Sequence, residues 1–129
     1  MEFAAVYAAV LDAYARLAHA VDHREPEMHV ALFTSDCVVE LPGRDRIVGR
    51  DALLESRRAV AGPSMRHHVT NVIVDVGADG SSADASASVY VIHGSDRPNS
   101  EAMWRTHFRM DHEGWRIHRH RVVIDPVGQ

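Results

Sequence analysis

The sequence predicts an α+β fold, with helices in the first half of the chain and an antiparallel sheet in the second. Apolar residues recur at helical spacing through residues 2–21, whereas apolar and polar residues alternate in four segments from Met65 onward. Turn-forming residues separate these segments, so consecutive strands are expected to form hairpins. Helices followed by a meander of strands favour a curved sheet folded over the helices, within one domain spanning residues 1–129.

Three helices are expected before the alternating segments. Residues 2–21 place apolar side chains on one face and form a helix about 30 Å long at the usual rise per residue. Pro26 suits the first turn of a second, short helix over residues 25–33. A third helix follows the brief strand IVG and ends at Gly62 and Pro63, which terminate helices.

Strands are expected in most of the remaining chain. DCVVEL, residues 36–41, predicts a first strand, and LPGRDR predicts the turn after it. A sheet of this kind buries one face against the first helix, and the concave space between them is a natural ligand pocket. The later strands are MRHHVTNVIVDV (65–76), SADASASVYVIH (82–93), EAMWRTHFRM (101–110) and GWRIHRHRVVI (114–124), joined by GADG, GSDRPN and DHEG.

Composition argues against several classes of protein. The formal net charge of -4 disfavours a general nucleic-acid-binding protein, because such proteins usually carry a basic excess. The single cysteine, Cys37, cannot form a disulfide within the chain and is expected to be a buried thiol. No apolar run approaches the roughly 18 residues needed to span a bilayer, and no signal-peptide pattern begins the sequence. We therefore expect a cytoplasmic protein that binds neither nucleic acid nor membranes.

Two adjacent histidines open the first long strand, in the segment RHHVTN. Because side chains alternate along a strand, His67 and His68 are expected on opposite faces, with Asn71 on the face of His67. Only one of the two rings can therefore face a given cavity. A histidine becomes a good base near neutral pH when a carboxylate fixes its tautomer and stabilises the imidazolium. Taken singly, either ring is compatible with a structural or surface role.

Asp22 falls at the predicted end of the first helix, in HAVDHRE. A carboxylate there opposes the helix dipole, and stability alone would favour a basic residue. A solvated aspartate that forms a turn and a functional carboxylate are both compatible with this position.

The closing hairpin has one basic and one apolar face. Arg105, His107 and Arg109 are expected beside Arg116, His118 and His120 on the outer side of the sheet. The other face, which includes Trp104, Thr106 and Phe108, is expected to turn toward the helices. The basic face is then expected to be solvated or to contact another subunit, with an anion site as the alternative.

Histidine pairs with the spacing of zinc ligands occur twice, as His118 with His120 and as His19 with His23. Neither pair has a clear third ligand in the sequence. We therefore predict no metal site.

The order of elements and four segments resemble the SnoaL-like proteins of the nuclear transport factor 2-like superfamily. HAVDHRE resembles the helix-end aspartate segment, and ALFTSDCVVEL followed by GRDAL resembles the second helix, first strand and third helix. RHHVTN resembles a strand motif with a histidine four residues before an asparagine, and WRTHFRMDHEGWRI resembles the closing hairpin. The resemblance extends from Val6 to about Ile124 and implies a cone-shaped, cystatin-like fold that encloses a pocket.

The resemblance also implies a site. Relatives include polyketide cyclases, scytalone dehydratase and hexachlorocyclohexane dehydrochlorinase, and in the last two an aspartate from the first helix faces a histidine across the pocket. The matching residues are Asp22 and His67, which the resemblance implies as the catalytic pair, with His67 inward and His68 outward. Substrate contacts are expected from Tyr14, Asn71, Trp104 and Phe108.

These expectations favour a small homodimeric enzyme without a cofactor that moves protons on a small-to-medium hydrophobic molecule. Lyase, isomerase and cyclase chemistry, for example in secondary metabolism, share the need for a base beside a group that manages developing charge. One alternative is a non-catalytic ligand-binding or assembly domain in which Asp22 and His67 merely satisfy each other. Another is the small subunit of a ring-hydroxylating oxygenase, which requires a large metal-bearing partner chain.

Overall fold

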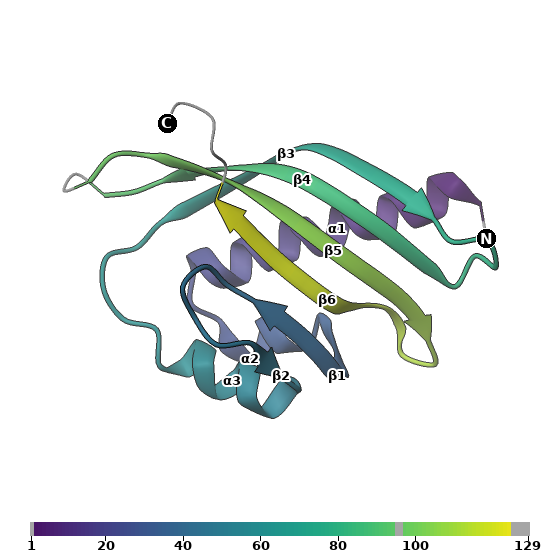
Figure 1. Ribbon diagram of the computed structural model, residues 1–129, viewed down its shortest axis with the longest axis horizontal. Helices are drawn as coiled ribbons and strands as arrows, with labels where there is room; N and C mark the ends of the chain where they lie inside the picture. Colours follow the sequence, from purple (N-terminus) through teal and green to yellow (C-terminus); the bar gives the residue numbers. More distant parts are fainter. Residues whose placement is uncertain (1, 95–96, 125–129) are drawn as a thin grey trace.

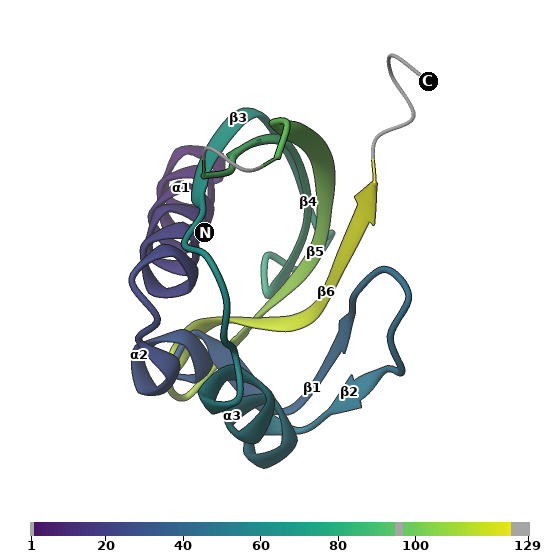
Figure 2. The same cartoon turned by 90° about the vertical axis from the view of Figure 1, so that its left-hand side faces the viewer.

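Helices packed against one curved sheet make up the computed structural model, which describes residues 2–94 and 97–124 (Figure 1). The six strands follow the order β2 (Ile47–Val48), β1 (Phe33–Glu40), β6 (Gly114–Ile124), β5 (Ser100–Asp111), β4 (Ser82–Ile92) and β3 (Arg66–Val76), and the sheet stays open between β2 and β3. Figure 2 shows the sheet curling so that α1 (Phe3–Asp22) lies along β3, while α3 (Arg50–Arg58) lies beside β1 and β2. The short α2 (Pro26–Val30) contacts α1 and α3. The predicted α+β architecture is therefore confirmed.

The three helices appear where the sequence predicts them. α1 (Phe3–Asp22) buries the stripe that includes Val6, Val10 and Leu17, because residues at helical spacing share one face. α2 (Pro26–Val30) begins at its proline, as expected for a residue that lacks a backbone N–H. α3 (Arg50–Arg58) ends four residues before Gly62, so the predicted third helix is too long.

The long strands form a continuous antiparallel meander: β3 (Arg66–Val76), β4 (Ser82–Ile92), β5 (Ser100–Asp111) and β6 (Gly114–Ile124). β1 (Phe33–Glu40) pairs in parallel with β6 and in antiparallel with the short β2 (Ile47–Val48). Each of the four long strands begins and ends within one residue of its prediction. Residues 95–96 of the predicted GSDRPN turn lie outside the described residues.

A β-bulge interrupts β3 between Thr70 and Ile73. Asn71 has φ 52, in the left-handed region that asparagine tolerates better than most residues. The extra residue reverses the alternation, so that Val74 is buried while Asn71 is exposed. The prediction that Asn71 shares the inward face of His67 is therefore wrong. The substrate contact expected from Asn71 is wrong for the same reason.

A second bulge lies in the closing hairpin. Phe108 pairs with Ile117 but His107 pairs with Arg119, which leaves His118 as the extra residue in β6. Beyond the bulge the faces of β6 are exchanged, and His120 lies opposite Thr106 with only 5% of its surface exposed. The prediction that His120 belongs to the outer basic face is wrong.

Acidic residues of neighbouring strands relieve the charge of the outer face. Asp84 of β4 lies 2.7 Å from Nδ1 of His107, and Asp36 of β1 lies 2.7 Å from Nη2 of Arg109. The sequence of the closing hairpin alone predicts a basic outer face, because arginine and histidine side chains recur on it. Pairing between strands distant in sequence supplies the carboxylates.

The apolar core fills the space between α1 and the inner face of the sheet. Cys37 is fully buried within this core as a free thiol, as expected. Among the described residues, no helix is long and apolar enough to cross a membrane.

Candidate functional site

A cavity of about 260 Å³ opens between the C-terminal end of α1, α3 and the inner face of the sheet. We call it the central cavity. Most of its wall is apolar, and the polar side chains are few and come from different elements. Its lining residues are Leu17, Val21, His29, Val39, Leu41, Pro42, Leu53, Arg57, Met65, His67, Val91, His93, Ser100, Ala102, Trp104, His120, Val122 and Ile124.

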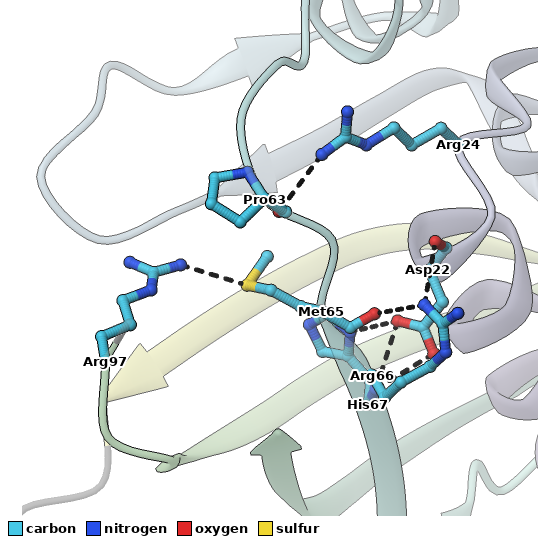
Figure 3. A network of polar contacts seen from close by, with 7 residues as sticks. All are labelled: Asp22, Arg24, Pro63, Met65, Arg66, His67 and Arg97. Carbon is cyan, nitrogen blue, oxygen red and sulfur yellow. Dashed lines mark hydrogen bonds and ion pairs between the residues drawn. The ribbon is translucent and has the colours of Figure 1, made fainter. Parts of the chain in front are cut away.

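His67 lines this cavity. Asp22 does not line it but contacts the His67 ring (Figure 3). Nδ1 of His67 lies 2.6 Å from Oδ1 of Asp22, and both side chains are largely buried, with 12% and 9% of their surfaces exposed. The backbone N–H of His67 also donates to both carboxylate oxygens, at 3.2 and 3.0 Å. The predicted contact between Asp22 and His67 is confirmed, while their role stays a prediction.

The neighbouring chain segments hold this pair in place. Arg24, just after α1, donates to the carbonyl oxygens of Gly62 and Pro63, the latter at 3.2 Å. These contacts tie the end of α1 to the segment that leads into β3 (Figure 3). His67 is therefore anchored from both sides, through its own backbone and through the chain that precedes it.

The contact with Asp22 assigns the proton of the His67 ring. A carboxylate only accepts hydrogen bonds, so Nδ1 of His67 must be the donor. In the neutral ring Nε2 then carries a lone pair, and no described residue hydrogen-bonds to it. His68 is exposed on the opposite face, as predicted. The ring of His67 is thus arranged to accept a proton at Nε2.

A second polar chain reaches the central cavity from the core. Tyr14 donates to Oγ1 of Thr106 at 2.8 Å, and Oγ1 of Thr106 lies 3.0 Å from Nδ1 of His120. The phenol gives its proton to Thr106, so the threonine hydroxyl can donate its own proton to Nδ1. When it does so, the proton of a neutral His120 ring sits on Nε2.

Burial lowers the pKa of His120 to about 4, so the ring is neutral at pH 7. Trp104 contacts both this ring and that of His67, with ring-centroid distances of 5.2 Å to His120 and 6.0 Å to His67. One indole therefore contacts an imidazole that accepts at Nε2 and another that can donate from Nε2. Sequence reasoning missed His120 because only the bulge in β6 turns it inward.

The predicted pocket walls are only partly correct. Trp104 lines the central cavity, whereas Tyr14 lines a second pocket together with Asp22 and His67. Phe108 lines neither and packs in the core, and both Tyr14 and Phe108 are 1% exposed. Tyr14 lies 5.6 Å from the ring of Trp104 and 5.8 Å from that of Phe108. Burial raises the pKa of Tyr14 to about 12, so it acts as a neutral donor that supports the wall.

Two further residues of the wall, His29 and Arg57, were not singled out by the sequence analysis. His29 stacks on Phe33 at 5.5 Å, and its Nδ1 has no hydrogen-bond partner among the described residues. Burial, together with the positive charges of Arg57 and His120, lowers the pKa of His29 to about 3. The buried Nε of Arg57 likewise has no hydrogen-bond partner within residues 2–94 and 97–124. Nothing in their spacing distinguishes them from ordinary helical residues.

No group of three or more histidine, cysteine or acidic side chains within residues 2–94 and 97–124 is placed to hold a metal ion. His19 and His23 stack on each other along α1, with ring centroids 5.8 Å apart.

Comparison with known families gives one match, to the SnoaL-like domain over residues 2–121. The chain belongs to the SnoaL-like domain family. A search of curated proteins found no match to this SnoaL-like chain.

Solved structures share the fold of this SnoaL-like domain. A candidate aromatic ring hydroxylase from Novosphingobium aromaticivorans is 25% identical, with a TM-score of 0.78 over 89% of this chain and 85% of that one. A candidate scytalone dehydratase from the same species is 20% identical, with a TM-score of 0.80 over 97% and 95%. A protein of unknown function with a cystatin-like fold, from Nostoc punctiforme, is 19% identical, with a TM-score of 0.80 over 92% and 90%.

Proposed function

We propose that this SnoaL-like domain is an enzyme that moves a proton on a small hydrophobic molecule, with His67 as the general base and Asp22 as the residue that orients it. The observation that carries the proposal is the 2.6 Å contact between Nδ1 of His67 and Asp22 at the wall of the central cavity. It leaves Nε2 of His67 without a partner among the described residues. A base held in this way is suited to lyase, isomerase and cyclase chemistry.

Removal of a proton from carbon also needs a donor for the charge that develops on a neighbouring oxygen. Nε2–H of His120 supplies such a donor at the same cavity when the hydroxyl of Thr106 donates to Nδ1 of that ring. His67 and His120 both line the cavity and both contact Trp104, so we expect a flat substrate beside the indole to reach both rings. The reaction then needs no cofactor, since both proton positions belong to the chain.

Exchange of hydrogen for deuterium tests the base without knowledge of the product. Activated ketones and polyketide-like aromatics are incubated with the protein in D₂O, and loss of the C–H signal is followed by proton NMR. His67→Ala should slow exchange by about 100- to 10,000-fold, the usual contribution of a general base. His68→Ala is the matched control and should exchange at the wild-type rate, because its ring lies on the outer face.

One observation favours a second function, that of a non-catalytic ligand-binding domain. Asp22 accepts two hydrogen bonds from the backbone of His67, so it also fastens the start of β3 to the end of α1. A purely structural pair would give His67→Ala a loss of stability but no loss of exchange. Equal exchange by His67→Ala and the wild type would therefore favour the binding domain.

A further inference from the structure

The described polar side chains that line the central cavity include basic groups but no acidic groups. Arginine, histidine and serine are the only polar residue types in its wall, and none of the described lining residues is acidic. The chain as a whole has 18 acidic and 14 basic residues, so a wall without carboxylates does not follow from composition. Asp22 does not line the cavity, and its carboxylate oxygens accept hydrogen bonds from the ring and from the backbone N–H of His67.

Arg57 is the only formally charged residue among the described residues of this wall. Its Nη2 lies 3.3 Å from the hydroxyl of Ser56, and its buried Nε has no hydrogen-bond partner in the part of the chain that the structure describes. No described carboxylate forms an ion pair with it, whereas the next residue, Arg58, lies 2.7 Å from Glu27. Burial, reinforced by Arg44, lowers the pKa of Arg57. An arginine that is partly removed from water without a counter-ion is costly unless a ligand supplies the anion.

His29 and His120 surround the same end of the cavity. Both are at most 6% exposed, both line the wall, and the positive charge of Arg57 acts on His29. We call His29, Arg57 and His120 the basic cluster. The two neutral rings can each donate one N–H, and a guanidinium presents a planar fork that matches a carboxylate.

We propose that the substrate is an apolar molecule bearing a carboxylate, and that the basic cluster binds this carboxylate while the apolar wall holds the rest. This inference rests on the proposed function, because it names the substrate class of the same cavity. The volume of about 260 Å³ lies below the roughly 300–1,000 Å³ of pockets that enclose drug-sized ligands. A substrate of one or two rings therefore suits the space.

Binding of a matched pair of ligands tests the substrate class without any turnover. Titration calorimetry at pH 7.5 compares 2-naphthoate with 2-naphthamide, which has a closely similar shape but no charge. We expect the wild type to bind the carboxylate about 10- to 100-fold more tightly, as a charge-assisted hydrogen bond implies. Equal affinities, or no measurable binding of 2-naphthoate at millimolar concentration, would overturn the proposal.

Variants assign the preference to Arg57. Arg57→Met should bind the two ligands equally, whereas Arg57→Lys should retain part of the preference because it keeps the charge. Arg58→Met is the matched control and should behave as the wild type, since Arg58 is exposed. A preference that survives in Arg57→Met would contradict the assignment.

Two further measurements separate this proposal from its alternatives. The melting temperature of Arg57→Met should equal or exceed that of the wild type, because an apolar side chain replaces an unpaired charge. A clear fall would show that Arg57 holds the fold, and would overturn its role as a ligand-binding residue. His67→Ala should still bind 2-naphthoate more tightly than 2-naphthamide. A wild type that shows this preference but catalyses no hydrogen exchange would support the substrate class and reject His67 as the base.

Discussion

At the scale of single residues, Asp22 has two contacts that serve different ends. Its carboxylate accepts the backbone N–H of His67, which fastens α1 to β3, and it accepts the ring N–H, which fixes the tautomer. The contact with the backbone N–H needs only an oxygen that accepts a hydrogen bond. The contact with the ring also needs a negative charge, because that charge stabilises the imidazolium. An aspartate at a helix end, unfavourable by the dipole argument, is thereby accounted for.

Asp22→Asn separates these two contacts. The amide oxygen can still accept the backbone N–H, so the free energy of unfolding should fall by only about 1–3 kcal/mol. Exchange should fall by roughly 100-fold or more, because the amide cannot stabilise a charged ring. Urea denaturation and the D₂O assay measure the two effects. Unchanged exchange in Asp22→Asn would show that the tautomer of His67 does not depend on the carboxylate.

At the scale of elements, the two bulges determine that His120 faces the central cavity and that Asn71 does not. The bulge at Asn71 returns the valines of the second half of β3 to the core, and the bulge at His118 brings His120 inward. Each adds one residue to its strand, and one residue is enough to exchange the two faces.

Asn71 should be sensitive to substitution although it is exposed, because its φ is 52. Asn71→Val should lower the free energy of unfolding by about 1–2 kcal/mol, since a β-branched residue disfavours the left-handed region. Asn71→Gly should be tolerated. His68→Val is the control at an exposed position of the same strand without positive φ and should cost less than about 0.5 kcal/mol. Equal costs at both positions would mean that the bulge is not fixed.

Periodicity predicted the helices and the long strands because burial repeats along each element. α1 and the meander β3–β6 follow directly from the apolar spacing. Bulges leave no such periodic signal, so the inward position of His120 and the outward position of Asn71 could not be predicted. Asp22 and His67 were predicted only through the resemblance, since spacing alone left both with structural alternatives. Arg57 and His29 could not be predicted as cavity residues, because their positions depend on how α2 and α3 pack against the sheet.

At the scale of the whole molecule, the outer face of the sheet is available for a second copy. Ile73 and Tyr90 are 61% and 41% exposed, beside a groove that includes Asp84, Arg105 and Arg119. A homodimer was expected because the outer face of the closing hairpin was predicted to be basic and uncovered. Carboxylates of neighbouring strands pair with His107 and Arg109 on this face, so that reason no longer holds. The exposed apolar residues remain, and exposed apolar surface often marks a contact site.

The homodimer predicted from the sequence therefore stays a prediction, with a sharper test. Light scattering at micromolar concentration should give twice the mass of one chain, and Ile73→Glu should shift the protein toward the monomer. Val48→Glu is the matched control, because Val48 is equally exposed, at 61%, on the short edge strand β2. A monomeric wild type would contradict the prediction.

The central claim is that His67 presents an unprotonated Nε2 to the cavity while Asp22 holds the proton of Nδ1. Nitrogen-15 NMR of the imidazole rings measures this directly, because long-range ¹⁵N–¹H correlations distinguish the two neutral tautomers. We predict the Nδ1–H tautomer for His67 and the opposite, Nε2–H tautomer for His120, in the ligand-free protein. His67→Ala and His120→Gln assign the two sets of signals. A neutral His67 that carries its proton on Nε2 would contradict the account, because that ring could not act as a base toward the cavity.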